Sequence, residues 1–281
     1  MKKLLSILSI CLVFISCSPD RVLYDELTNT GTRKSPFMYF EGKPFNGVGF
    51  DVWSNGQLKY EFNLKDGVYD GLQKSWYETG QIENEYNYRD GKQDGLQKSW
   101  YPNGQLESET NYKDDKKDGV YQEWNINNGQ LSYEGTWKNG KKDGLHQEWY
   151  KNGQLKSETN YKDDKKDGVH QSWELNGQPS YVTTFKNGQS NGLWQKWYYN
   201  GQLEYEYHYK DGKLDGVYQR WYENGQMKGE YNYRNGKRDG VQQSWYENGQ
   251  LAMKGTDKNG QSIGLYQTWY ENGQLSFEKH Y

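Results

Sequence analysis

The chain contains few of the residues that build a thick core or a covalent framework. Among its 281 residues are two cysteines, five prolines and four methionines, and hydrophobic residues make up only 32%. The mean hydropathy is −1.26. A large aliphatic core is therefore excluded, which leaves a thin structure whose buried layer is largely aromatic. Cys11 lies in a leading segment that we expect to be removed, so the mature protein is predicted to have no disulfide and no cysteine-based metal site.

An excess of one charge sign is also lacking. The chain has 35 Lys and Arg against 38 Asp and Glu, a net charge of −3, with both signs mixed throughout. No basic stripe marks a nucleic-acid surface, so we predict that the protein does not bind nucleic acid.

The leading segment is typical of a targeting signal. Two lysines are followed by the apolar run Leu4–Ile15, and Phe14-Ile15-Ser16-Cys17 resembles the lipobox of a bacterial lipoprotein signal peptide. We predict a signal peptide at residues 1–16 with lipid attached to Cys17. An ordinary secretory signal and a short membrane anchor are the alternatives, although the run is short for a membrane span.

The polar stretch after this signal has no sustained periodicity, and we predict a tether at residues 17–36. A lipid on Cys17 predicts a location in the bacterial cell envelope, on the outer membrane or the cell surface. Membrane contact is expected through the lipid anchor only.

Glycine and aromatic residues are abundant instead. The 33 glycines, 27 tyrosines and 12 tryptophans recur with a period of about 24 residues, best seen as GVQQSWYENGQL from Gly240 to Leu251. The anchoring glycine occurs ten times, as Gly47, Gly71, Gly95, Gly119, Gly144, Gly168, Gly192, Gly216, Gly240 and Gly264. Such periodicity predicts a repeat array in which each unit packs against its neighbours.

Each repeat is expected to form a β-hairpin. The loop Glu247–Gly249 suits a type I turn followed by a glycine in the left-handed region, which places Trp245 opposite Leu251. Simple alternation from that pair predicts one face with the tryptophans and the apolar side chains, namely Val241, Gln243, Trp245, Leu251, Met253 and, in fuller repeats, Tyr112, Tyr161 or Tyr233. Gln242, Ser244 and Tyr246 are expected on the other face.

The tryptophans of successive hairpins form one column, which we predict to be the structural core. It comprises Trp76, Trp100, Trp124, Trp149, Trp173, Trp197, Trp221, Trp245 and Trp269. Asp-Gly and Asn-Gly pairs between the hairpins are strong turn signals, so successive hairpins should join in one meander. The predicted fold class is all-β, an elongated antiparallel β-hairpin repeat array that forms a curled or twisted single sheet.

Catalytic and metal-binding patterns do not stand out. His146 and His170 occupy equivalent positions in neighbouring repeats, about 10 Å apart, which is too far to share a metal ion, and we expect both to be ordinary surface residues. A column of glutamates that includes Glu206 and Glu230 is expected to pair with Lys and Gln on adjacent strands rather than to act in acid–base catalysis. We predict no enzymatic activity, no cofactor and no metal.

The repeats resemble a known family. YEGTWKNGKKDG, residues 133–144, resembles the MORN repeat, and WYKNGQLKSE, residues 149–158, is similar to the bacterial subtype in YwqK-family antitoxins. The resemblance covers residues 37–281 as ten units with a partial leading repeat. It implies an elongated all-β array with a non-enzymatic protein-binding role, which in some members neutralises a toxin encoded beside it. The lipoprotein signal departs from that pattern, so an antitoxin role would require interception of the toxin at entry.

A break in the repeat pattern suggests where a protein partner, a toxin among the candidates, would bind. Trp194 replaces the usual Gln, Tyr or His, and with Tyr198, Tyr218 and Tyr222 it is predicted to form an exposed aromatic strip. The alternative function is binding of an envelope glycan or the cell wall, because Trp-Tyr pairs with Gln, Asn and Glu suit sugar rings.

Overall fold

The computed structural model describes residues 20–32 and 35–281. The predicted signal peptide and the lipidation site Cys17 lie outside the described residues. The chain divides into two compact units, one ending at Gln93 and one beginning at Asp94. No helix in the described part is long and apolar enough to cross a membrane.

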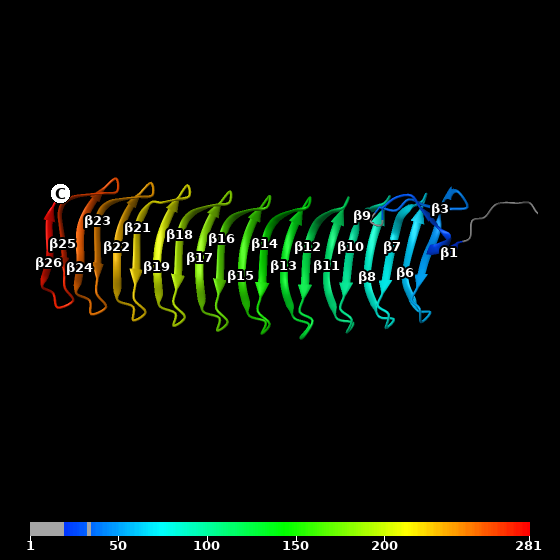
Figure 1. Ribbon diagram of the computed structural model, residues 1–281, viewed down its shortest axis with the longest axis horizontal. Helices are drawn as coiled ribbons and strands as arrows, with labels where there is room; N and C mark the ends of the chain where they lie inside the picture. Colours follow the sequence, from blue (N-terminus) through cyan, green and yellow to red (C-terminus); the bar gives the residue numbers. More distant parts are fainter. Residues whose placement is uncertain (1–19, 33–34) are drawn as a thin grey trace, which may run out of the picture. The chain divides into compact units, whose positions relative to one another are not determined.

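The first unit is a small, mostly antiparallel sheet with an N-terminal cover, by which we mean the described residues before Gly47 (Figure 1). Its elements are β1 (Arg21–Leu23), the 3-10 helix η1 (Tyr24–Glu26), β2 (Thr28–Asn29), β3 (Met38–Phe40), β4 (Lys43–Pro44), β5 (Gly47–Val52), β6 (Leu58–Lys65), β7 (Val68–Trp76), β8 (Ile82–Arg89) and β9 (Lys92–Gln93). Strand β1 pairs in parallel with β5, whereas β5 to β9 pair antiparallel in chain order. Strands β2, β3 and β4 form a separate sheet, so the partial leading repeat does not extend the main one.

The first unit contains the apolar core of the described chain. Met38 and Phe45 are each 1% exposed and pack with Val22, Phe62 and Leu64. Val22 belongs to residues 17–36, which the sequence predicted as a tether. Its strand β1 pairs with β5, and its side chain packs in the core with Phe62 and Leu64 of β6.

The second unit is a row of hairpins joined in chain order (Figure 1). Its strands are β10 (Gly95–Trp100), β11 (Leu106–Lys113), β12 (Lys116–Trp124), β13 (Leu131–Lys138), β14 (Lys141–Trp149), β15 (Leu155–Lys162), β16 (Lys165–Trp173), β17 (Pro179–Lys186), β18 (Gln189–Trp197), β19 (Leu203–Lys210), β20 (Lys213–Leu214), β21 (Gly216–Trp221), β22 (Met227–Arg234), β23 (Lys237–Trp245), β24 (Leu251–Lys258), β25 (Gln261–Trp269) and β26 (Leu275–His280). The predicted all-β hairpin array is confirmed.

The hairpin turns have the predicted geometry. In the repeat of Trp245, the Gly249 N–H donates to the Tyr246 carbonyl at 2.9 Å and the Tyr246 N–H donates to the Gln250 carbonyl at 2.8 Å. Gly249 has a φ of +83°, the left-handed conformation that the predicted loop requires. Trp245 lies opposite Leu251, as expected. The asparagine of the turn accepts the Gln250 N–H at 2.9 Å, which explains the Asn-Gly-Gln signature.

The connections between hairpins are two-residue turns with both residues at positive φ. Asn235 has a φ of +48° and Gly236 one of +82°, as a type I′ turn demands. Asp115 and Asp164 take the glycine position at +64° and +67°. The KDDKKDG segments are therefore turns, in agreement with the sequence interpretation.

The predicted composition of the two faces was wrong beyond the first pair. A bulge lies between Ser244 and Trp245, so Ser244 faces Met253 while Trp245 faces Leu251. The extra residue transfers Met253 and the later tyrosines to the face of Gln242. We call the side with Tyr121, His146, His170, Trp194 and Tyr218 the aromatic face, and the opposite side, with the tryptophan column, the tryptophan face.

The tryptophan column is not the most buried part of the sheet, as the sequence had predicted it to be. All nine tryptophans of the column are partly exposed, and in the second unit the most buried side chains lie on the aromatic face. They are mainly polar, including Gln97, Thr110, His146, Thr159, His170, Thr183, Tyr207 and Gln242. The described part of this unit consists of strands and turns of one layer, so the sheet is stabilised by ladders of neighbouring side chains rather than by a second layer.

Candidate binding surface

An aromatic cluster occupies the aromatic face over β18 to β22. The ring centroids of Trp194 and Tyr207 are 4.9 Å apart, and those of Tyr207 and Tyr218 are 5.3 Å apart. Tyr231 continues the cluster at 5.8 Å from Tyr218. Tyr207 is 8% exposed, and burial raises the pKa of its phenol well above the usual range. Offset and tilted rings at such distances pack favourably and make a rigid, amphipathic surface.

The four residues of the predicted strip fall into two groups. The rings of Trp194 and Tyr218 both pack against the ring of Tyr207, and both residues are partly buried. Tyr198 and Tyr222 lie at the turn end of their hairpins, where their hydroxyls donate to the carbonyls of Trp221 at 3.0 Å and Trp245 at 2.9 Å. The structure therefore brings two of the four together, and gives the other two a role in joining repeats.

This tyrosine-to-carbonyl bond recurs along the array. In the first repeat Trp53 replaces the tyrosine, and its indole N–H donates to the carbonyl of Trp76 at 3.0 Å. Turn asparagines add a second link, for example from Asn200 to the Glu223 carbonyl at 2.9 Å. Most hairpin turns are thus held to the next one.

The expectation that both histidines are ordinary surface residues was wrong. His146 is 4% exposed and His170 is 8% exposed. The Nε2 of His146 lies 2.9 Å from the Thr136 carbonyl and its Nδ1 lies 2.5 Å from the Tyr133 hydroxyl. Burial is the main cause that lowers the pKa of each imidazole below its ordinary value, so both are held in an environment that favours the neutral form.

The sequence signal for this burial was the column that the histidines share. Tyr121, Trp194 and Tyr218 occupy the same position in other repeats and also lie on the aromatic face. A position that accepts Tyr, Trp, His and Gln is typical of a partly polar buried row. The column was recognised at Trp194, but its burial was not predicted for the histidines.

The glutamate column has the partners that the sequence predicted. Gln195 donates to Glu206 at 2.6 Å and Gln219 donates to Glu230 at 2.8 Å. In the first unit Lys74 pairs with Glu85 at 3.3 Å. These carboxylates are therefore engaged between strands. Within residues 20–32 and 35–281, no group of three or more His, Cys, Asp or Glu is placed to hold a metal ion.

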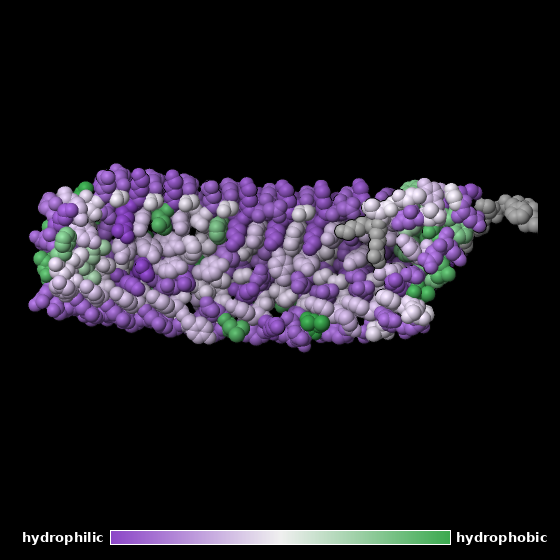
Figure 2. Space-filling view, viewed as in Figure 1, coloured by the Kyte–Doolittle hydropathy of each residue, from purple (hydrophilic) through white to green (hydrophobic). Residues whose placement is uncertain are grey.

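The surface of the second unit is polar at its turns. Figure 2 shows strongly hydrophilic residues along the upper turn edge and paler residues across the middle of the face in view. Large continuous hydrophobic areas are not seen along these middle strands.

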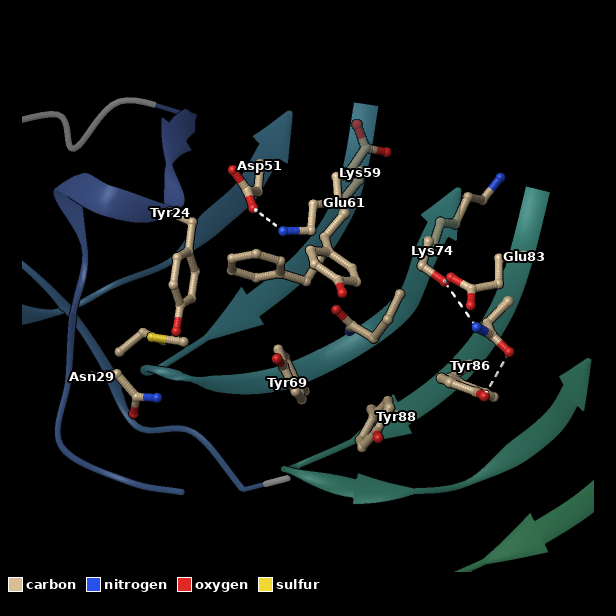
Figure 3. Close-up of a pocket in the computed structure, with 16 residues that line it drawn as sticks. Tyr24, Asn29, Asp51, Lys59, Glu61, Tyr69, Lys74, Glu83, Tyr86 and Tyr88 are labelled. Carbon is tan, nitrogen blue, oxygen red and sulfur yellow. Dashed lines mark hydrogen bonds and ion pairs between the residues drawn. The ribbon is translucent and has the colours of Figure 1, made fainter. Parts of the chain in front are cut away.

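A second candidate site is a pocket of about 600 Å³ in the first unit. Figure 3 shows Tyr24 from η1, Tyr69 from β7, and Tyr86 and Tyr88 from β8 around it. Asn29 lies at its margin. The N-terminal cover thus supplies one side of the pocket and the sheet supplies the other.

Polar groups on the sheet side of this pocket are fixed by one another. Tyr86 donates to the Asn84 side-chain oxygen at 2.7 Å, and the Asn84 amide donates to Ser75 at 2.9 Å. The Ser75 hydroxyl donates to Glu83 at 3.0 Å. Gln73 is almost fully buried beside these hydrogen-bonded side chains, and its side-chain oxygen has no hydrogen-bond partner among the described residues. Aromatic walls with a few oriented polar groups are typical of small-molecule sites.

Comparison with known families identifies the repeat. The MORN repeat variant family matches residues 69–90, 93–114, 142–163, 190–211, 214–235, 238–259 and 263–281. The matches cover more than half of the chain, so the protein belongs to this family of repeats, a class of interaction module. A search of curated proteins finds no match. Hairpins of the same kind also form where the family does not match, as in β16 and β17.

Proposed function

We propose that this protein is a non-enzymatic interaction module that holds a protein partner on the aromatic face of its second unit. The observation that supports this most directly is the cluster of Trp194, Tyr207 and Tyr218 on a single-layer sheet. Rigid aromatic side chains are the residues that most often dominate binding energy in protein interfaces. The repeat family supports a binding role in general.

The test is crosslinking of the protein in its own cells, followed by identification of the captured protein. Replacing Trp194 and Tyr218 by Ala should reduce capture at least tenfold, because the loss of interface aromatics typically costs 1 kcal/mol or more each. Val217→Ala is the matched control, since Val217 is exposed on the tryptophan face next to Tyr218. Equal capture by the aromatic-face variant and the control would contradict the proposal.

We further propose that the partner is a toxin and that the protein acts as an immunity protein like the YwqK-family antitoxins, anchored by lipid on Cys17 in the bacterial envelope. The repeat type and the lipobox-like sequence support this reading. Cys17→Ala should move the protein from the membrane fraction to the soluble envelope fraction. Expression of the neighbouring reading frames with and without this protein tests toxicity directly, and survival that does not depend on it would exclude the antitoxin role.

A second candidate function is binding of an envelope saccharide in the pocket of the first unit. The tyrosine walls and the fixed chain Tyr86–Asn84–Ser75 support it, since sugar rings offer apolar C–H faces and hydroxyl groups together. Retention on isolated peptidoglycan or polysaccharide that is lost in Tyr86→Ala, but kept in the aromatic-face variant, would favour this function. Absence of retention would dismiss it.

A further inference from the structure

Three lysines line up on the aromatic face near the two-residue turns. Lys117 in β12, Lys142 in β14 and Lys166 in β16 occupy the same register position in successive repeats, opposite Tyr112, Trp137 and Tyr161. The backbone carbonyl of each accepts an N–H from the next inter-hairpin turn, at 2.8 to 3.0 Å, so their positions are fixed alike. We call these three residues the lysine row.

Aromatic rings separate the ammonium groups along the lysine row. The Lys117 ammonium lies 3.9 Å from the Tyr121 ring centroid on its own strand and 5.0 Å from that of Trp137 on the next strand. The Lys142 ammonium lies 4.9 Å from the Tyr161 centroid, and that of Lys166 lies 5.0 Å from the Phe185 centroid. Cation and ring therefore alternate on consecutive strands from β12 to β17. Such cation–π contacts orient the amines without neutralising them.

The ammonium groups of the lysine row are not paired with carboxylates of the residues that the structure describes, although carboxylates lie at the neighbouring turns. Within the described chain, none of the three lysines forms an ion pair with a carboxylate. Burial, and then the charge of Lys142, lowers the pKa of Lys166, and Lys142 acts on Lys117 in the same direction. The nearby carboxylates of Asp118, Asp164 and Asp167 accept backbone N–H groups, those of Asn139, Lys142 and Asn187 respectively.

Acidic side chains do occur on the same face, at the other end of the strands. Glu123 and Glu148 lie there, and Glu123 partly offsets the lowering of the Lys117 pKa. In these repeats the lysines of the face thus lie near the two-residue turns, and Glu123 and Glu148 lie near the hairpin loops.

The fold does not require these charges. Ser190 and Leu214 occupy the equivalent register in the next two repeats, opposite Phe185 and Tyr209. Both repeats form the same hairpins without a lysine. Arg238 returns a cation to this register one repeat later. The run of lysines in three consecutive repeats is therefore a local feature and not part of the architecture.

The spacing of the lysine row matches one conformation of a partner chain. Lysines on every second strand are about 9.6 Å apart, because neighbouring strands are spaced by about 4.8 Å. A polyproline II helix rises about 3.1 Å per residue with three residues per turn, so every third side chain lies on one side at intervals of about 9.3 Å. A β-strand presents same-side residues about every 6.7 Å and does not match.

We propose that the lysine row binds an acidic, proline-rich segment of a partner protein, with a carboxylate at every third residue and its axis across the strands. Trp137 and Tyr161 receive the intervening prolines, as aromatic grooves do for other polyproline II ligands. This assignment rests on the proposed role as a protein-interaction module and names the chemistry of its partner.

The probe is a fluorescein-labelled peptide that contains Glu-Pro-Pro-Glu-Pro-Pro-Glu, titrated with the full-length protein and followed by fluorescence anisotropy. A peptide of the same composition with the sequence Glu-Glu-Glu-Pro-Pro-Pro-Pro controls for net charge. The spaced peptide should bind at least fivefold more tightly, and its affinity should fall as salt rises because the contacts are ionic.

Variants of the protein localise the effect. Replacing Lys117, Lys142 and Lys166 by Gln should weaken binding about tenfold or more, and Lys142→Gln alone about two- to fivefold, as expected for partly exposed ion pairs. The matched control is the triple Gln variant of Lys116, Lys141 and Lys165, which changes the net charge equally but removes exposed lysines one residue earlier. Its affinity should stay within twofold. Replacement of the row by Ser, the residue at position 190, repeats the test with a side chain that the fold accepts.

Three outcomes would overturn this assignment: equal binding of the two peptides, equal loss in the row and control variants, or row-dependent binding of inorganic polyphosphate without binding of the spaced peptide. None of them tests the crosslinking at Trp194 and Tyr218. If capture there persists while the peptide fails to bind, the interaction function stands and the lysine row has another role.

Discussion

At the scale of single residues, the array uses hydroxyl and amide groups where most folds use apolar contacts. The Tyr198 hydroxyl donates to a carbonyl of the next repeat, whereas neighbouring Tyr199 is 66% exposed. Two adjacent tyrosines thus have different physical roles, which a pattern of aromatic pairs does not distinguish.

The first prediction compares these two tyrosines. Tyr198→Phe should destabilise its hairpin by about 1 kcal/mol, because the Trp221 carbonyl loses its side-chain donor. Tyr199→Phe makes the same chemical change on an exposed side chain and should alter stability by less than about 0.5 kcal/mol. Urea unfolding of both variants measures the difference. Equal effects would show that the inter-repeat bond contributes nothing.

The second prediction concerns the buried histidines. Because burial holds their folded-state pKa below the ordinary value of about 6.5, the unfolded chain takes up protons first as the pH falls. Their stabilising contribution is therefore complete above about pH 6.5 and is lost as the pH falls from there through the lowered folded pKa. A variant with His146→Gln and His170→Gln, using the residue found at Gln97 and Gln242, should lose less stability between pH 7.5 and 5. Urea midpoints at the two pH values test this. An unchanged pH dependence would contradict it.

At the scale of the hairpin, the turn residues determine which residues pair across the strands, and a bulge determines which side chains share a face. The Asn-Gly-Gln signature predicted the pairing of Trp245 with Leu251, because a loop of that length with a left-handed glycine permits little else. The bulge before Trp245 was not predictable, since no glycine or proline marks it. A one-residue offset moved a whole column of tyrosines to the opposite face.

The third prediction tests the turn. Gly249 has a φ of +83°, and an added Cβ would meet only the Gln226 side chain, at 3.6 Å. Gly249→Ala should therefore cost about 1 to 2 kcal/mol through backbone strain rather than through a clash. Gly249→Asn should cost less, because Asn tolerates this conformation. Hydrogen exchange of β23 and β24 reports the local loss, and equal protection in both variants would refute the strain argument.

At the scale of the second unit, the sequence period predicted the repeat architecture but not the distribution of charge. The fold follows from the period because each hairpin contacts only its neighbours. The net charge of the whole chain did not predict the lysine row. The row arises because the sheet places Lys117, Lys142 and Lys166 at one register on one face. Part of the aromatic cluster was predicted: the sequence identified Trp194 and Tyr218, but it did not identify Tyr207, whose ring lies between theirs.

The fourth prediction follows from this nearest-neighbour construction. Deleting residues 216–239 removes one full period and joins Asp215 to Gly240, which occupies the same register position as Gly216. The shortened array should fold, with hydrogen-exchange protection of β12 to β16 unchanged, because those strands keep their own neighbours. Deleting residues 217–239 instead leaves Gly216 next to Gly240 and shifts the retained part of β23 and all later residues by one position. That shift turns each side chain at the junction to the wrong face, so the retained part of β23 and strands β24 to β26 should lose protection in this variant alone. Similar protection in the two deletions would mean that side-chain register does not specify the pairing of these hairpins.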